Sequence, residues 1–343
     1  MIIPNPDIES FIKTLRSGKA SRVPIAELGV HPFIKEKFIG KKIINVKDEI
    51  EFWYKAGYDY VKLQPVVDFN PAKIKSETNL TYNDDGTVFR KWASESSGVI
   101  TSIKEFEQYI FPDISEIDYK KFEEASKLLP EGMGIIGQYG DIFTMTWEMM
   151  GFENFSLALF EDETIIQMIN DKVGEIVLSM FRNMSELDCV KVLWYSDDIA
   201  YTNGLMVSPD TLEKYFFPWL EKIGEIARQT NKPLIYHSDG ILFDVMERLI
   251  ECGINALHPI EPKAMDIVEV KERFGDRISL IGNIDVDLLA RGTKDKIRKN
   301  VLFNIENVGF NGGYCVGSGN SIPEYVNLEN YITMIETAKS FSY

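Results

Sequence analysis

The chain has 343 residues and carries 37 Lys and Arg against 53 Asp and Glu, which gives a formal charge of −16. This charge argues against a nucleic-acid partner, since such affinity comes mostly from Lys and Arg, and every apolar run is shorter than the roughly 18 residues of a membrane span. Three cysteines, and an N-terminal stretch 1–13 without the basic start and apolar run of a signal peptide, favour a cytoplasmic setting.

Along the chain, a short apolar run is repeatedly followed by a polar turn and a longer stretch with helical spacing. This alternation predicts parallel strands joined by crossover helices. Eight runs are expected strands: residues 23–28, 60–63, 134–137, 190–195, 233–237, 256–258, 278–281 and 313–316. Eight strand–helix units predict an α/β fold, a (β/α)8 TIM barrel, over a single domain of residues 1–343. An open doubly wound sheet is the alternative.

Several connecting elements have clear boundary signals. Ser208 and Pro209 are typical of a helix start, and Pro218 is expected to kink that helix. Apolar spacing predicts a helix over 241–252, ended by Gly253. Asn327 is expected to cap a last helix that runs to about residue 338. The polar stretch from 68 to about 100 is expected to cross one end of the barrel as a long excursion.

Reactive groups of a barrel collect where its strands end. The residues at or just after the expected strand ends form a polar, carboxylate-rich ring: Glu27, Gln64, Gln138, Asp197, Asp198, His237, Asp239, Glu261, Asn283, Asp285, Cys315 and Ser318. Glu27 lies among apolar neighbours, so it is either a proton donor with a raised pKa or the partner of a base. Glu261 and Asp197 are further candidate catalytic carboxylates.

The segment Tyr236–Gly240 is the most informative part of this ring. His237 and Asp239 are two residues apart after an apolar strand, so in extended chain their side chains point the same way. They form a candidate metal-ligand pair or acid/base pair, and Cys315 is a candidate third ligand of a zinc site. The alternatives are that Asp239 caps the next helix and that Cys315 is a small buried core residue.

Other residues fit a substrate pocket. Prolines hold His258 and Glu261 in a rigid loop, where a site role and a structural role are equally open. Aromatic residues, including Tyr139 and Trp147, are candidates to line a cavity for an aromatic substrate, although core packing is the alternative. The expected substrate-binding residues are Gln64, Gln138, Tyr139, Trp147, Asn283 and Ser318.

Together these motifs resemble the uroporphyrinogen decarboxylase superfamily. The resemblance is clearest from about Tyr195 onward. It is carried by Ser208–Pro209, Ile235–Gly240, His258–Pro262, Leu280–Asp285 and Gly317–Pro323, with a looser match at Gly137–Gly140. It implies a (β/α)8 barrel whose pocket lies at the strand C-termini.

The superfamily has two main branches, and this sequence departs from the decarboxylases. Their first strand is followed by an Arg-Gln-Ala-Gly-Arg segment that grips substrate carboxylates, whereas Glu27–His31 holds no arginine. They also carry a histidine after the last strand, where this chain has Gly317-Ser318-Gly319. In the corrinoid-linked methyltransferases, the thiol-methylating members have zinc bound by His-x-Cys and a later Cys. His237 and Cys315 match, and Asp239 replaces the first Cys.

This resemblance implies a methyltransferase that presents a methyl–oxygen bond, for example of a methoxylated ring, to the cobalt of a separate corrinoid protein. Zinc held by His237, Asp239 and Cys315, or a proton from Glu27 or Glu261, is expected to stabilise the leaving oxygen. A homodimer is plausible because family members often pair. A decarboxylase-like carboxy-lyase and a non-catalytic binding barrel remain the alternatives.

Overall fold

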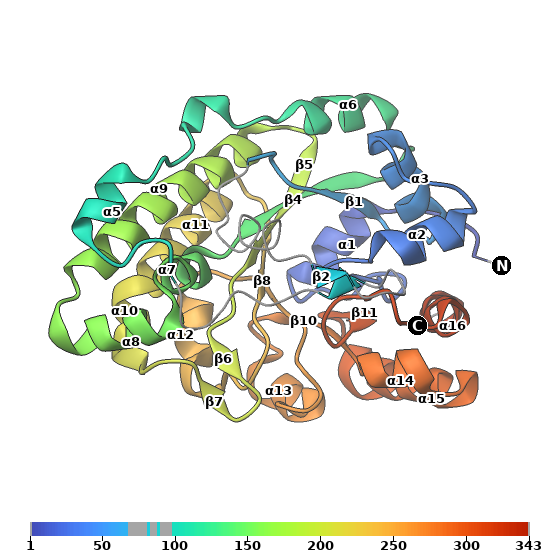
Figure 1. The fold of residues 1–343 in the computed structure, drawn as a ribbon. Helices are drawn as coiled ribbons and strands as arrows, with labels where there is room; N and C mark the ends of the chain where they lie inside the picture. The colour runs from blue at the N-terminus through green and yellow to red at the C-terminus, as the bar shows by residue number, and fades with distance from the viewer. Residues whose placement is uncertain (1, 68–80, 83–87, 90–97, 342–343) are drawn as a thin grey trace.

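The computed structural model describes residues 2–67, 81–82, 88–89 and 98–341. At its centre a curled parallel sheet of seven strands has the order β1-β4-β5-β8-β9-β10-β11 (Figure 1). These strands are β1 (Tyr60–Leu63), β4 (Gly134–Gly140), β5 (Val190–Ser196), β8 (Leu234–His237), β9 (Ala256–His258), β10 (Ser279–Ile284) and β11 (Tyr314–Ser318). Nearly every residue of these strands is buried, as expected when both faces of a parallel sheet are covered.

Helices surround this sheet on its outer side (Figure 1). The N-terminal half contributes α1 (Ile8–Leu15), α2 (Pro32–Ile39), α3 (Val46–Lys55), α5 (Ile103–Gln108), η1 (Ile114–Glu116), α6 (Lys120–Leu128), α7 (Ile142–Met150), α8 (Phe152–Glu161) and α9 (Thr164–Glu186). The C-terminal half contributes α10 (Pro209–Tyr215), α11 (Phe217–Gln229), η2 (Phe243–Val245), α12 (Met246–Glu251), α13 (Ile267–Phe274), α14 (Val286–Arg291), α15 (Lys294–Asn304), η3 (Ile305–Gly309) and α16 (Leu328–Ser340). The alternation of strands and helices confirms the predicted barrel-like α/β fold. Within the described residues, no helix combines the length and apolarity of a membrane span.

The first expected strand, residues 23–28, is present only as a bridge between Ile25 and Val316 of β11. Pro24 has no N–H to donate, and the N–H of Glu27 donates to the Tyr60 hydroxyl at 2.9 Å instead of to a strand carbonyl. The prediction of eight full strands is therefore wrong by one, although the segment still lies beside β11 and delivers Glu27 to the barrel.

The predicted starts of α10 and α16 are present, but the predicted kink at Pro218 is not. The Ser208 hydroxyl caps α10, with Pro209 as its first residue, but the chain breaks between α10 and α11 rather than kinking at Pro218. Gly253 follows α12 with a φ of +94°, and Asn327 caps α16. Most of the predicted excursion at 68–100 lies outside the described residues. Within it, β2 (Thr81–Tyr82) and β3 (Val88–Phe89) pair antiparallel, and β6 (Ala200–Tyr201) and β7 (Gly204–Leu205) form a second short pair elsewhere.

Candidate functional site

Three potential metal ligands meet where β5 and β8 end. The two strands are neighbours, and Ser196 is in register with His237, so the residues that follow each strand lie side by side. One ligand atom from each of Asp198, His237 and Asp239 lies within 4.8 Å of the other two. The His237 Nε2 atom is 3.8 Å from Asp198 Oδ1, which also accepts a hydrogen bond of 2.8 Å from the Asp239 N–H. The predicted pairing of His237 with Asp239 is therefore present, with Asp198 as third member.

Asp239 is held in an electrostatically unfavourable position. Burial, followed by the nearby charges of Asp198 and Glu261, raises the pKa of its carboxyl group to about 8. Its Oδ2 atom accepts a hydrogen bond of 2.5 Å from Asn320 Nδ2, whereas its buried Oδ1 atom receives none from any residue that the structure describes. A cation between Asp239 and Asp198 would relieve this repulsion and favour the ionised carboxylate.

A second histidine fixes the orientation of His237. The Nδ1 atoms of His237 and His258 are 2.8 Å apart, so one donates a hydrogen bond to the other. Burial lowers the pKa of His237 to about 4 and that of His258 well below its usual value, so both rings are neutral. When His237 Nδ1–H is the donor, the Nε2 lone pair of His237 is available to a metal ion.

Cys315 does not join this group. The expectation that it ends the last strand is wrong, because β11 continues to Ser318 and Cys315 is its second residue. The side chain is fully buried, and burial followed by the charge of Asp59 raises the pKa of its thiol. Among the described residues, its sulfur is not one of the ligand atoms that lie within 4.8 Å of one another. The core alternative for Cys315 therefore describes its surroundings, and Asp198 takes its place in the group.

Glu27 is a buried carboxyl group held by the end of β11. Its Oε1 accepts a hydrogen bond of 2.8 Å from the Ser318 N–H, and its Oε2 accepts one of 2.6 Å from the Ser318 hydroxyl. Burial outweighs these hydrogen bonds and raises the pKa of Glu27 to about 8. At neutral pH the group is mostly protonated, as required of a proton donor.

The other two expected carboxylates have different surroundings. Glu261 accepts a hydrogen bond of 2.9 Å from the Gly240 N–H, which places it beside Asp239. Asp197 is fully buried, and its oxygens accept hydrogen bonds from the Phe143 N–H at 2.7 Å, the Thr144 N–H at 2.9 Å and the Tyr195 hydroxyl at 2.6 Å. These contacts favour a structural role for Asp197, as the acceptor at the N-terminus of α7.

Replacing Asp197 by alanine is expected to lower the free energy of unfolding by about 2–4 kcal/mol, because buried donors at α7 lose their acceptor. Asp198→Ala is the matched control, since the Asp198 side chain is 47% exposed, and we expect less than about 1 kcal/mol from it without metal. Urea denaturation with a chelator present measures both. Equal stability of the Asp197 variant and the wild type would contradict the structural role.

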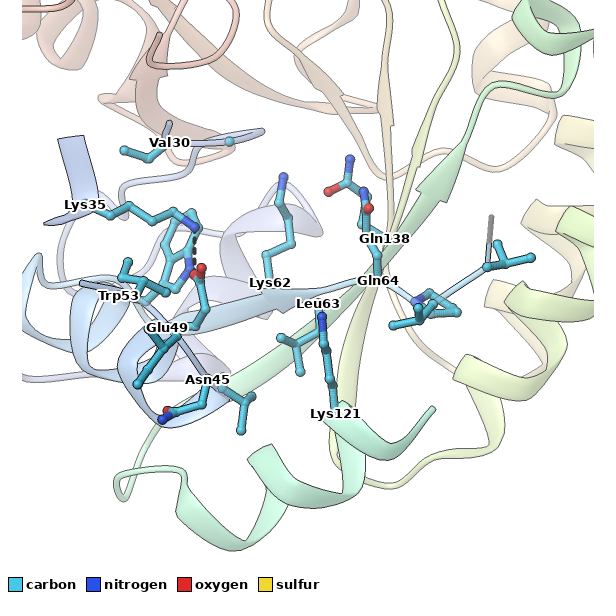
Figure 2. A pocket seen from close by; sticks show the side chains of 17 residues that line it. Val30, Lys35, Asn45, Glu49, Trp53, Lys62, Leu63, Gln64, Lys121 and Gln138 are labelled. Carbon is cyan, nitrogen blue, oxygen red and sulfur yellow. Dashed lines mark hydrogen bonds and ion pairs between the residues drawn. The ribbon is translucent and has the colours of Figure 1, made fainter. Parts of the chain in front are cut away.

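Two of the expected substrate-binding residues line a pocket with a volume of about 590 Å³ (Figure 2). Gln64 is exposed at the end of β1, and Gln138 on β4 donates a hydrogen bond of 3.2 Å to the Ser196 hydroxyl. Lys62 lines the same pocket. Figure 2 shows Lys62 and Gln138 extending to the same side of their strands.

The remaining expected substrate residues are engaged elsewhere. Asn283 accepts a hydrogen bond of 3.0 Å from Asn304, and Ser318 holds Glu27. The Trp147 ring packs edge-on against Phe152, with a centroid distance of 5.5 Å, and neither Trp147 nor Tyr139 belongs to the described lining of this pocket.

Two features of the candidate site are not predicted from the sequence pattern. Asp198 is expected at a strand end but not as a ligand, although it follows β5, next to the strand that carries His237. Lys62 is not among the expected site residues. Its signal is a lysine within the apolar run Tyr60–Leu63 of a buried strand.

Comparisons with known proteins agree on the family and on the fold. The sequence model described as uroporphyrinogen decarboxylase (URO-D) matches residues 95–341. The methylcobamide:CoM methyltransferase MtaA of Methanosarcina barkeri is 25% identical over 218 residues, which is 62% of this chain and 61% of that protein. A uroporphyrinogen decarboxylase of Trichodesmium erythraeum is 27% identical over 138 residues, 40% of this chain and 38% of that one.

The matched segment thus spans about three fifths of the length of MtaA and less than two fifths of the length of the decarboxylase. Among solved structures, a methyltransferase from Methanosarcina mazei superposes with a TM-score of 0.68 at 16% identity, covering 96% of this chain and 97% of that one. At this identity the similarity establishes a shared fold.

Proposed function

The chain belongs to the uroporphyrinogen decarboxylase (URO-D) family, whose members are enzymes, and from this premise we propose that it is a metal-assisted methyltransferase. It would move a methyl group between a small donor, such as a methoxylated aromatic compound, and a separate corrinoid protein. The observation that carries this proposal is the group of Asp198, His237 and Asp239 at the ends of β5 and β8.

The residues of this group fit a divalent metal ion. One imidazole nitrogen and two carboxylate oxygens make a three-ligand set of the kind found in catalytic zinc sites, where a further position stays open to substrate. The Oδ1 atom of Asp239, buried without a hydrogen bond from the described residues, supports this assignment. When bound, zinc would act as a Lewis acid that stabilises the negative charge on a leaving oxygen. Oxygen ligands in place of thiolates leave such an ion harder and more acidic.

The chain's own residues supply the proton chemistry. Protonated Glu27 can donate to the leaving oxygen of a donor bound nearby. The Ser318 hydroxyl, which lies 2.6 Å from Glu27 and 3.1 Å from the Asn320 carbonyl, can hold either form of this acid, because a hydroxyl both donates and accepts. Glu261 is the second candidate, as a half-buried neighbour of Asp239. Asn320 orients Asp239 through its side-chain amide.

His258 is proposed to act through His237, as a positioning residue. A His258→Phe variant keeps a ring beside Trp194 but loses the hydrogen bond to His237, and we expect its zinc affinity to fall by about 10–100-fold. Competition with a chromogenic chelator measures this affinity. Thermal unfolding of the metal-free variant controls for folding. Wild-type zinc affinity in a folded variant would contradict the role of His258.

We propose that a separate protein carries the corrinoid. The name of the MtaA relative, a methylcobamide methyltransferase, supports a corrinoid as one of the two reactants. The proposed methyl transfer converts a methyl ether and cob(I)alamin into the free alcohol or phenol and methylcobalamin. The proton for the leaving oxygen comes from Glu27 or Glu261.

The direct test uses purified zinc-loaded protein, cob(I)alamin as a stand-in for the corrinoid protein, and a panel of methoxylated benzenes and benzoates. Methylcobalamin formation, followed by the absorbance of the corrinoid, is the expected result, and a chelator is expected to abolish it. Absence of transfer from the whole panel, in both directions, would contradict the proposal. Conversion of uroporphyrinogen to coproporphyrinogen would instead support a decarboxylase, which Glu27–His31 disfavours because it lacks arginine.

A further inference from the structure

Lys62 has an unusual place in the barrel wall. It lies on the short strand β1, and its Nζ atom is buried, without a hydrogen-bond acceptor among the residues described. The Nζ atom lies 4.6 Å from the centroid of the Trp194 ring. Buried lysines are rare unless they are paired with an acid. Glu49, the one acid of the described pocket lining, is paired with Lys35 and not with Lys62.

The titratable groups around Lys62 supply little negative charge. Glu27 is mostly protonated at neutral pH because burial raises its pKa to about 8. Lys35 adds a like charge, although it is paired with Glu49 at 2.6 Å. Burial, followed by the charge of Lys35, lowers the pKa of Lys62 well below its usual value. An anion bound beside the amine would counter this shift and favour the ammonium form.

The pocket as a whole has the opposite charge to the protein. Its described lining contains three lysines, Lys35, Lys62 and Lys121, and one acid, Glu49 (Figure 2). Because Lys35 is paired with Glu49, the excess positive charge comes from Lys121 and from the protonated form of Lys62, in a chain with a net charge of −16. The pocket volume of about 590 Å³ suits a small organic molecule. A cavity of this sign concentrates anions from solution.

We propose that this pocket binds the carboxylate group of a small organic anion, with the Lys62 ammonium group as its anchor. Trp194 connects the anchor to the metal-ligand group, because the same ring that faces Lys62 also packs edge-on against His258 at a centroid distance of 5.2 Å. If the proposed function holds, the methyl donor is a compound that carries a carboxylate group. It would be anchored at Lys62 with its methyl group toward His237.

Benzoate binding, measured by isothermal titration calorimetry on the full chain, tests the anchor without metal or corrinoid. Benzamide, of the same shape but uncharged, is the ligand control. We expect saturable binding of benzoate, binding at least about tenfold weaker for benzamide, and a loss of about 10–100-fold in benzoate affinity in Lys62→Met. Lys120→Gln, an exposed lysine on α6 outside the pocket, removes the same charge and is expected to leave affinity unchanged.

Lys62→Met is expected to fold, because it replaces an amine that lacks a partner among the described residues by an apolar chain of similar length. Its melting temperature should equal or exceed that of the wild type. Equal affinity for benzoate and benzamide, unchanged affinity in a folded Lys62→Met, or no saturable benzoate binding would each overturn the inference. Benzoate binding that needs Lys62, combined with no methyl transfer, would overturn the proposed function and leave the anion site standing.

Discussion

Replacing His237 by alanine is expected to remove bound zinc from the purified protein and to lower methyl transfer by a factor of about 10³ or more. The variant loses the one nitrogen ligand of the group, and Asp198 and Asp239 alone form a weaker and more exposed site. Loss of a metal that stabilises a leaving oxygen by several kcal/mol corresponds to a rate factor of about this size. Metal analysis by mass spectrometry and the cob(I)alamin assay give the two readouts.

The matched control for this experiment is His31→Ala. His31 is a half-exposed histidine that precedes α2 and lies outside the group, so zinc content and transfer rate should match the wild type. A His237→Ala protein that keeps stoichiometric zinc, or keeps full activity after losing it, would contradict the assignment of His237 as a ligand.

Glu27→Gln is expected to lower the rate of methyl transfer by about 10²–10⁴, because an amide keeps the shape of the carboxyl group but cannot donate its proton. The pH dependence gives a sharper signature. Since the pKa of Glu27 is raised to about 8, the wild-type rate should be constant below that pH and fall as pH rises through about 8. The residual rate of the variant should not show this decrease above about pH 8, which we call the alkaline limb of the pH–rate profile.

Ser318→Ala refines the same test. Its hydroxyl hydrogen bond stabilises the Glu27 carboxylate, so removing it should raise the pKa of Glu27 and move the alkaline limb to higher pH.

The raised pKa of Glu27 also makes the free energy of unfolding depend on pH. The folded state holds a proton that the unfolded chain releases above about pH 4.5, so the contribution of Glu27 is full below that pH and is lost as pH rises toward 8. An alkaline limb that persists unchanged in Glu27→Gln would exclude Glu27 as its origin.

The sequence predicted the fold well because its signals were local. Apolar runs located all seven strands of the sheet, and hydroxyl, proline and amide signals located the starts of α10 and α16. The strand at 23–28 failed because a single proline and a side-chain hydroxyl took the place of ladder hydrogen bonds, which composition does not reveal. Most of the stretch 68–100 lies outside the described residues, so its predicted course stays a prediction.

The sequence pattern locates some residues of the candidate site, and the residues that it does not locate share one cause. His237, Asp239 and Glu27 were found because they follow or end apolar runs. The predicted last strand ends at 316, whereas β11 runs to Ser318, so Cys315 lies inside the strand and not at its end. Along a strand, each further residue lies about 3.3 Å on and points to the opposite face of the sheet. To predict Asp198 and Lys62 as part of the candidate site, one must know which strands are neighbours and to which face each side chain points. That information comes from the three-dimensional register.

The proposed function requires that Asp198, His237 and Asp239 together hold one metal ion. Anomalous X-ray diffraction from crystals grown with zinc, recorded on both sides of the zinc absorption edge, tests it directly. We expect a single peak at about 2.0–2.2 Å from His237 Nε2 and from one carboxylate oxygen each of Asp198 and Asp239. A peak at Cys315, or zinc bound only at surface carboxylates with none beside His237, would contradict it.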